Sequence, residues 1–256
     1  MILTDDNYFS KEANEAYMSC SQFKNFLRCQ AAALAELNGE YERERSTALL
    51  VGSYVDEALT GDLERFKKEN PELFKRDGTL KSEYVKADAM IERCRRDKLF
   101  MEYLDGEHQK IMTGTISGVP FKIKIDCLHD DKIVDLKTTK SFDSVYDPDE
   151  CGRVPWFMEY NYVIQAGIYQ TIVEQVTGKR LPFYLAAVTK EESPDICVLE
   201  IVQEDIDVQM KKVQELAPMF NAIKLGVIEP ERCEFCNYCK ATKVLTEPMK
   251  SNDMWF

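Results

Sequence analysis

Two aspartates and a lysine near the middle of the chain are the residues best suited to chemistry: Asp126, Asp135 and Lys137. They lie within residues 121–140, where apolar and charged side chains alternate on both sides of a polar turn at 129–132, as in a β-hairpin. If that turn is symmetrical, antiparallel pairing places Asp126 directly across from Asp135. We therefore expect the two carboxylates to share one face of the hairpin.

Two opposed carboxylates require a cation. Side chains directly opposed in an antiparallel pair lie about 5 Å apart at Cβ, where like charges repel each other. Carboxylate oxygens at this spacing suit Mg²⁺ or Mn²⁺. Lys137 would lie on the same face, with Lys124 across the pair from it, beside whatever the cation holds. The set predicts a metal-assisted phosphoryl-transfer site; a hairpin whose charges only face water is the alternative.

A second candidate site is formed by cysteines. Three of the nine cysteines follow one another at two-residue spacings near the C-terminal end: Cys233, Cys236 and Cys239. The acidic, polar beginning of the chain does not resemble a secretory signal, so we expect metal ligation rather than disulfides. Three clustered cysteines favour a soft metal, and either zinc or an iron–sulfur cubane needs a fourth ligand.

The fourth ligand is expected to be another cysteine. The chain has only two histidines, and one of them, His129, falls in the predicted hairpin turn. We expect Cys29 rather than Cys20, because Cys29 falls inside a predicted helix over residues 21–37 that would hold its position. Zinc and iron–sulfur are alternatives on this pattern.

The elements that must position these residues follow from periodicity and from Gly and Pro breakers. Helices are predicted over residues 21–37, 47–59, 64–68, 82–104, 157–176 and 205–225. Strands are predicted over residues 110–116, 121–126, 133–137, 181–189 and 196–202. A loop over residues 138–156, next to the candidate site, would be a place for substrate contacts.

Two of these helices carry polar residues that could reach a site. The helix over 47–59 could point Asp56 into a cleft, and a solvated helix face is the alternative. The helix over 157–176 places Gln165 and Tyr169 on one polar and aromatic face. That face could contact phosphates or bases, or could simply lie at the boundary between core and solvent.

Composition limits the class of protein. The chain has 256 residues and a net charge of −12, so it would not coat nucleic acid with its whole surface, although a basic groove at one cleft is compatible with that charge. We expect such a groove to be lined by four cations near the candidate site: Lys122, Lys124, Lys140 and Arg153. No apolar run reaches about 18 residues, so we expect no membrane span and a cytoplasmic protein.

The order of the motifs resembles that of one nuclease superfamily. The motifs are Gly52-x-x-x-Asp56, Asp126, Asp135-x-Lys137 and Gln165-x-x-x-Tyr169. As a set they resemble the PD-(D/E)XK nucleases, with the greatest similarity to the RecB/RecE-like exonuclease branch of bacteria and phages. The opening Ser19-x-Ser21 and Cys29, with the closing cysteines, are similar to the iron–sulfur variety of that branch. The resemblance extends from about residue 19 to residue 240.

This resemblance implies an α/β (α+β) fold with a restriction-endonuclease-like core, in which helices flank a mixed β-sheet. We expect one nuclease domain over residues 1–256. Its parts would be a helical N-terminal part at 1–105, the catalytic core at 106–202, and a C-terminal helix with a cysteine-rich tail at 203–256.

The resemblance also implies roles for the hairpin residues. Asp126 and Asp135 would ligate the metal together with the carbonyl of Leu136. Asp56 would join them, although relatives often carry histidine at that position. Lys137 would orient the attacking water and offset the charge that develops on the phosphate.

Roles for DNA contact and for the cysteines follow from the same resemblance. Gln165 and Tyr169 would position the DNA strand, and we expect Lys140 and Arg153 to contact DNA nearby. A [4Fe–4S] cluster would be held by four cysteines: Cys29, Cys233, Cys236 and Cys239. Many relatives have a longer gap before the last cysteine, and zinc is the rival metal.

The implied function is a Mg²⁺- or Mn²⁺-dependent DNA exonuclease that hydrolyses phosphodiester bonds at double-stranded DNA ends. The branch further implies 5′-to-3′ polarity, phage-type or bacterial recombination, and a strand-annealing protein as partner, with a homo-oligomer as an open possibility. One alternative is an endonuclease or single-strand nuclease on the same core. The other is a DNA-binding accessory subunit without catalytic activity.

Overall fold

The computed structural model describes residues 1–43, 46–147 and 151–248. Part of the predicted loop over 138–156 and the end of the predicted tail over 203–256 fall outside these residues. No helix in the described part of the chain is both long enough and apolar enough to cross a bilayer.

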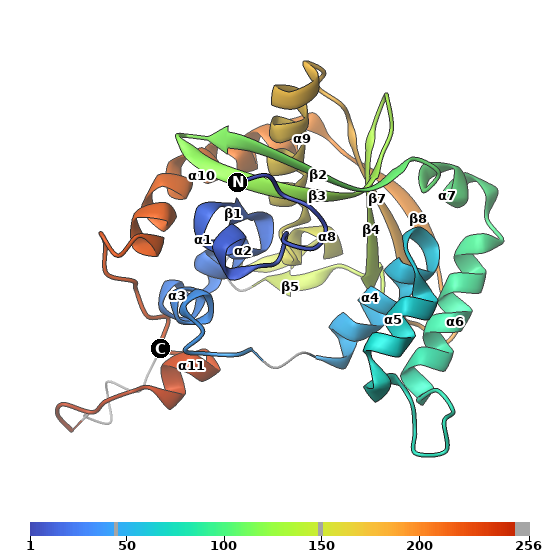
Figure 1. Ribbon diagram of the computed structural model, residues 1–256, viewed down its shortest axis with the longest axis horizontal. Helices are drawn as coiled ribbons and strands as arrows, with labels where there is room; N and C mark the ends of the chain where they lie inside the picture. Colours follow the sequence, from blue (N-terminus) through green and yellow to red (C-terminus); the bar gives the residue numbers. More distant parts are fainter. Residues whose placement is uncertain (44–45, 148–150, 249–256) are drawn as a thin grey trace.

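A mixed six-stranded β-sheet lies at the centre of the molecule (Figure 1). Its strands are β1 (Met18–Ser19), β2 (Glu107–Ile116), β3 (Val119–Leu128), β4 (Ile133–Thr139), β7 (Phe183–Thr189) and β8 (Ile196–Ile201). β2 pairs with β3 in antiparallel fashion, β4 pairs with β7 in parallel, and β7 pairs with β8 in antiparallel fashion. A separate hairpin of β5 (Val145–Asp147) and β6 (Gly152–Val154) lies inside the segment predicted as a loop.

One edge of β3 is only partly paired. β2 covers one edge of β3, whereas β1 and β4 share the other edge. β1 pairs with Phe121 and Lys122, and β4 pairs with Cys127 and Leu128. Among the described strands, none covers this edge between those two pairings. The uncovered stretch ends at Asp126, so the sheet itself leaves an opening at a predicted site residue.

Helices cover both faces of the sheet, as predicted for the fold class. The first core contains α2 (Cys20–Arg28), α9 (Tyr162–Thr177) and α10 (Gln203–Lys224). The second core contains α4 (Thr47–Thr60), α6 (Ser82–Arg95) and α7 (Lys98–Tyr103). Successive residues of β7 alternate between the two cores, with Leu185 in the first core and Ala186 in the second. Both faces of this strand are therefore buried, which explains its continuous apolar sequence.

Shorter helices complete the chain. They are α1 (Lys11–Ala16), α3 (Gln30–Asn38), α5 (Leu63–Glu69), a 3₁₀ turn (Pro71–Leu73), α8 (Trp156–Glu159) and α11 (Asn237–Ala241). In Figure 1, α3 and α11 lie together at one side of the molecule, and α4, α5 and α6 lie at the other.

Three of the predicted helices are broken in the structure. The helix predicted over 157–176 is α8 and α9, separated by Tyr160 and Asn161. The other two breaks lie at Cys29 and at Asp97. Cys29 has an extended backbone between α2 and α3, so its predicted place inside a helix is wrong. Its Sγ accepts the N–H of Ala32 (3.5 Å) and caps the start of α3. The helix predicted over 82–104 is also two helices, because Asp97 Oδ1 accepts the N–H of Phe100 (2.9 Å) at the start of α7. In both cases a side-chain acceptor begins a new helix where apolar periodicity alone would let the first continue.

Candidate active site

The candidate active site lies where β3 and β4 separate. Two residue pairs join these strands: Cys127 with Val134 and Leu128 with Ile133. Their register is the one predicted from the hairpin turn. Beyond these pairs β4 follows β7 in parallel to its end, with Asp135 paired to Leu185, and leaves β3. Asp126 and Asp135 therefore lie beside a gap between β3 and β4 rather than paired with each other. The predicted opposition of Lys124 and Lys137 is therefore wrong.

Hydrogen bonds hold the two aspartates in place around this gap. Asp126 Oδ2 accepts the backbone N–H of Leu136 (2.9 Å). Asp135 is 1% exposed, and its Oδ1 accepts a hydrogen bond from Gln165 Nε2 (2.7 Å). Its Oδ2 forms an ion pair with Lys137 Nζ but accepts no hydrogen bond. The alternative of a hairpin whose charges only face water is thus wrong for Asp135.

A third carboxylate reaches the site from α4. Asp56 is half-buried, and Thr60 Oγ1 donates a hydrogen bond to its Oδ1 (2.8 Å); the alternative of a solvated helix face is wrong. Gly52, one turn earlier, lets α4 approach β4 closely. A Cβ at that position would lie 3.3 Å from Thr138 Oγ1.

The electrostatics of these groups are dominated by burial. Burial raises the pKa of Asp126 well above its usual range, and the charges of Asp135 and Asp56 raise it further. Burial also raises the pKa of Asp56. Burial acts to lower the pKa of Lys137, but attraction to Asp135 and Asp126 outweighs it, and the pKa is raised. Three carboxylates therefore share one lysine in a poorly hydrated place, which favours an additional cation.

The donors around the gap are of the kind that a hard divalent metal takes. Carboxylates come from Asp56, Asp126 and Asp135, whose charges act on one another, and the Leu136 carbonyl oxygen, 3.2 Å from Lys137 Nζ, is a further oxygen donor on β4. Asp135 Oδ2 is buried with the Lys137 ammonium as its ion-pair partner, and a carboxylate oxygen has a further lone pair that could coordinate a cation. Oxygen donors of this kind bind Mg²⁺ and Mn²⁺.

The two predicted DNA-positioning residues of α9 contact protein atoms of the site. Gln165 donates to Asp135, as described, and its Oε1 accepts a hydrogen bond from Lys24 Nζ (3.0 Å). Tyr169 is buried, and its hydroxyl donates to the Lys124 carbonyl of β3 (3.0 Å). Sequence reasoning missed Lys24, because no spacing distinguishes it from other lysines. Two hydrogen bonds link Lys24 to Asp135: Lys24 donates to Gln165, and Gln165 donates to Asp135.

A cleft of about 790 Å³ opens beside the site. Its walls come from α4, β4, the start of α2 and the turn between α8 and α9. Among the residues that line it are Asp56, Asp126, Leu136, Lys137, Lys140, Tyr160, Tyr162 and Lys190. Lys190 was not identified from the sequence; its Nζ donates to the Ala48 carbonyl (3.0 Å), and burial lowers its pKa.

The four cations predicted to line one groove do not lie together. Lys140 is exposed in the cleft wall. Lys122 is 1% exposed and donates to Asn14 Oδ1 (2.8 Å), and Lys124 pairs with Asp5 (2.9 Å). For these two lysines the prediction is wrong, because N-terminal residues cover them. Arg153 lies on β6, outside the lining of the cleft, and its guanidinium donates to the Ser144 backbone and side chain.

Comparison with known proteins identifies the family. Residues 19–242 match the family described as a PDDEXK-like domain of unknown function (DUF3799). The chain belongs to this PDDEXK-like family. It is therefore a member of the PD-(D/E)XK nuclease superfamily, as the order of its motifs predicts.

Solved structures agree with this assignment. The PDDEXK-like chain is 41% identical to a protein from Eubacterium rectale whose crystal structure is named that of a "putative exonuclease". The TM-score is 0.95, and the match covers 99% of this chain and 98% of that one. The structure of SSO0001 also matches, with 14% identity, a TM-score of 0.32, and coverage of 86% and 92%. No curated protein sequence matches the chain.

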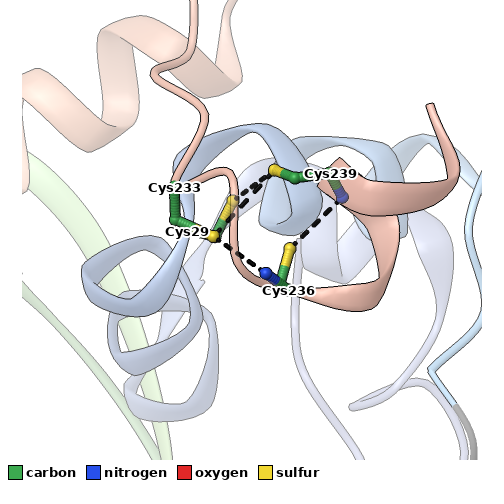
Figure 2. Close-up of side chains that lie close together, drawn as sticks. All are labelled: Cys29, Cys233, Cys236 and Cys239. Carbon is green, nitrogen blue, oxygen red and sulfur yellow. Dashed lines mark hydrogen bonds between the residues drawn. The ribbon is translucent and has the colours of Figure 1, made fainter. Parts of the chain in front are cut away.

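The PDDEXK-like protein also brings its four predicted cysteine ligands together (Figure 2). The Sγ atoms of Cys29, Cys233, Cys236 and Cys239 all lie within 4.8 Å of one another. Of the two cysteines weighed as the fourth member, Cys29 is the one that lies with the other three; its role as a metal ligand stays a prediction. Cys20 is instead buried in the first core. Burial raises the pKa of its thiol, and the charge of Lys24 opposes that shift.

Backbone N–H groups point at several of these sulfurs. Cys233 Sγ accepts from the N–H of Cys236 (3.3 Å), and Cys236 Sγ accepts from the N–H of Cys239 (3.4 Å). Burial acts to raise the pKa of Cys233, but hydrogen bonds from the backbone of Phe235 and Cys236 outweigh it and lower the pKa to about 7. Such bonds favour thiolate, the form that binds metals.

The donor set fits a metal centre with four thiolates. Tetrahedral zinc with bonds of about 2.3 Å would place the sulfurs roughly 3.8 Å apart. Cys29 and Cys239 are 3.5 Å apart at Sγ, and Cys233 and Cys239 are 4.0 Å apart. In a cubane each thiolate binds a different iron, so these sulfurs would have to move apart to hold one.

Proposed function

We propose that the protein is a Mg²⁺- or Mn²⁺-dependent deoxyribonuclease that degrades DNA from its ends. The observation that supports this most directly is the meeting of Asp126, Asp135 and Lys137 at the opening between β3 and β4, beside an accessible cleft. The E. rectale protein of the same fold, named a putative exonuclease, favours action at ends.

Each residue of the site has a distinct task in this proposal. Asp126, Asp135, Asp56 and the Leu136 carbonyl would hold the divalent cation. When bound, that cation supplies Lewis-acid stabilisation of charge on the phosphate oxygens. Lys137, held by Asp135 at the wall of the cleft, orients the attacking water and offsets the negative charge that develops on the phosphate.

Residues around these groups position them. Gln165 holds one oxygen of Asp135, so the other oxygen is directed to Lys137 and the cation. Lys24 in turn holds Gln165. We propose that Lys140, in the cleft wall, and Arg153, on the neighbouring hairpin, contact phosphates of the strand. Tyr169 supports the DNA-binding cleft indirectly, because its hydroxyl donates to the Lys124 carbonyl and fixes the backbone of β3 there.

We further propose that the four cysteines hold a structural metal centre. The family resemblance favours a [4Fe–4S] cluster, whereas the short sulfur separations favour zinc. Either metal would join α3 to the C-terminal α11 without taking part in hydrolysis. The cellular setting that accompanies this proposal is recombination in the cytoplasm, with a strand-annealing protein as partner.

The deciding experiment compares end-labelled linear DNA with closed circular DNA of the same sequence, with Mg²⁺ and with EDTA. We expect stepwise loss of the linear DNA with Mg²⁺ alone, and a fall of about 10²- to 10³-fold in Lys137→Ala. Lys98→Ala is the matched control, because the Lys98 side chain is 92% exposed on α7 and has no task in the proposed reaction. Equal cleavage of the circle would indicate an endonuclease. DNA binding without cleavage by the folded protein would indicate the accessory subunit.

A further inference from the structure

A pair of stacked tyrosines stands at the wall of the cleft, on the turn between α8 and α9. The rings of Tyr160 and Tyr162 are 5.7 Å apart between centroids, with an angle of 29° between their planes. Both residues line the same cleft as Asp126 and Lys137. Asn161, between them, has a left-handed backbone (φ 52°, ψ 42°). Asparagine adopts this conformation more readily than other residues with a Cβ, and it turns the chain so that the tyrosines on either side share one wall.

The inner ring of the pair is fixed by the active site. Lys137 Nζ lies 5.4 Å from the centroid of the Tyr162 ring, and Lys24 Nζ lies 5.1 Å from it. Trp156 meets the same ring edge-on at 6.0 Å. Two cations and an indole therefore hold Tyr162. A ring placed in this way is a rigid backing for whatever stacks beyond it.

The outer ring is open to the cleft. Tyr160 is 39% exposed, and in the part of the chain that the structure describes its ring stacks on no ring other than that of Tyr162. The cleft that it faces is also lined by the cations Lys137, Lys140 and Lys190. An aromatic surface in a cleft lined by cations matches a nucleotide, which offers a flat base and an anionic phosphate.

We propose that Tyr160 stacks on an unpaired base next to the scissile phosphate, with Tyr162 as its backing ring. This inference rests on the proposed nuclease function and adds the substrate class: a strand that has left the duplex before it is cut. A paired base inside a duplex is covered by its neighbours on both sides and cannot offer its face to a side chain. Stacking of this kind is tolerant of sequence, because every base has an aromatic face.

The test is an abasic-site scan in a single-stranded oligonucleotide, in which one base at a time is removed. In the wild-type protein we expect cleavage to slow by about 5- to 150-fold when the missing base flanks the cut phosphate, the range given by loss of one stacked base. Tyr160→Ala should cut the intact oligonucleotide more slowly by a similar factor and should lose this position dependence. Tyr160→Phe should keep both. Phe9→Ala is the control, because Phe9 is a 74% exposed aromatic residue near the N-terminus and does not line the cleft.

A binding measurement separates this inference from the nuclease function. With EDTA present, so that no DNA is cut, 2-aminopurine at the flanking position should lose fluorescence on binding wild type and Tyr160→Phe, but not Tyr160→Ala. Unchanged quenching and an unchanged abasic profile in Tyr160→Ala would overturn the stacking proposal, even if the protein cuts DNA. A dependence confined to the paired terminal base of a duplex would also overturn it. Failure of the wild type to cut any DNA would overturn the nuclease function while leaving the quenching result to decide the stacking.

Discussion

The carboxylate site and the cysteine site differ in what holds them together. The carboxylate site lies at the junction of two large apolar cores, and its residues are fixed by β-strands and by α4 and α9. The cysteine site has only a small core of its own, made of Cys29, Ala31, Ala32 and Cys239. Cys29 and Cys239 are 210 positions apart in the chain, so little besides the cysteines and a few contacts joins the two ends there.

This difference predicts opposite relations between site and fold. At the carboxylate site the fold forces like charges together, and the site adds function at some expense of stability. At the cysteine site, backbone N–H groups donate to the sulfurs and so favour their thiolate form. A metal bound there would stabilise the fold. A substitution in the first site should therefore change hydrolysis and spare stability, whereas one in the second should do the reverse.

The largest expected effect is on hydrolysis in Asp126→Asn. Loss of a metal ligand should lower the cleavage rate by at least about 10²-fold, a few kcal/mol of barrier. Burial and the neighbouring acids raise the pKa of Asp126 well above its usual range, so the folded state holds this proton more tightly than the unfolded state. As pH rises and the group ionises, stability is lost. A neutral Asn should therefore give a melting temperature in EDTA at neutral pH that is no lower than that of the wild type.

The control for this variant is Asp131→Asn, which removes an exposed charge from the hairpin turn. It should leave both the cleavage rate and the melting temperature close to wild type. A marked fall in the melting temperature of Asp126→Asn would contradict the view that the carboxylate site costs stability.

A smaller effect is expected when Gln165 is replaced by leucine. Asp135 Oδ1 would lose its donor and Lys24 its acceptor. Groups that orient a metal ligand typically contribute 10- to 100-fold in affinity or activity, so we expect a Mg²⁺ titration of cleavage to shift by about tenfold to higher concentration. Gln170→Leu is the matched control on the same helix, because Gln170 is also buried but donates to the Leu181 carbonyl and to Gln203. It should lower the melting temperature and leave the Mg²⁺ titration unchanged.

Cys239→Ser should show the reverse pattern. We expect loss of the bound metal and a clear fall in melting temperature, while the initial cleavage rate at low temperature stays within about threefold of wild type, because the cysteines take no part in hydrolysis. Metal analysis of the anaerobically purified wild type identifies the centre: brown protein with about four irons per chain, or colourless protein with one zinc. Cys197→Ser, outside both sites, is the control. A folded but inactive Cys239→Ser protein would show that α2, which leads from Lys24 to Cys29, couples the two sites.

The smallest effect is expected for Gly52→Ala. The new Cβ would lie 3.3 Å from Thr138 Oγ1, so α4 would have to move by a few tenths of an ångström and carry Asp56 with it. Alanine also favours the helix by about 1 kcal/mol. We expect a cleavage rate lowered by a few fold with an unchanged or raised melting temperature. Adding Thr138→Ala to this variant should restore the rate if the contact is the cause; no recovery would place the effect elsewhere.

Local patterns in the sequence were sufficient for several features of these sites. The register of the β3–β4 turn follows from alternation over a short stretch, and the structure pairs Cys127 with Val134 in that register. The cysteine spacing at 233–239 predicts a shared site in the same way. Ligand counting predicted a fourth cysteine, because a metal with three clustered ligands needs a fourth and histidine was scarce; the choice of Cys29 over Cys20 rested on a continuous helix that the structure breaks at Cys29. Each of these inferences depends on residues close in the chain or on simple ligand counting.

Other features depend on contacts between distant segments, and no local period encodes them. β3 and β4 separate because β4 continues along β7, and β1 occupies the edge of β3. Lys24 reaches Asp135 only through a helix that follows it by 141 positions. Lys122 and Lys124 are covered by the N-terminal segment, although their alternation in the strand predicts exposure to a groove. The sequence by itself thus determined which residues have the chemistry, because side-chain type and short spacing are local properties. Only tertiary packing decided which of them share the cleft, because burial and strand separation arise where separate elements meet.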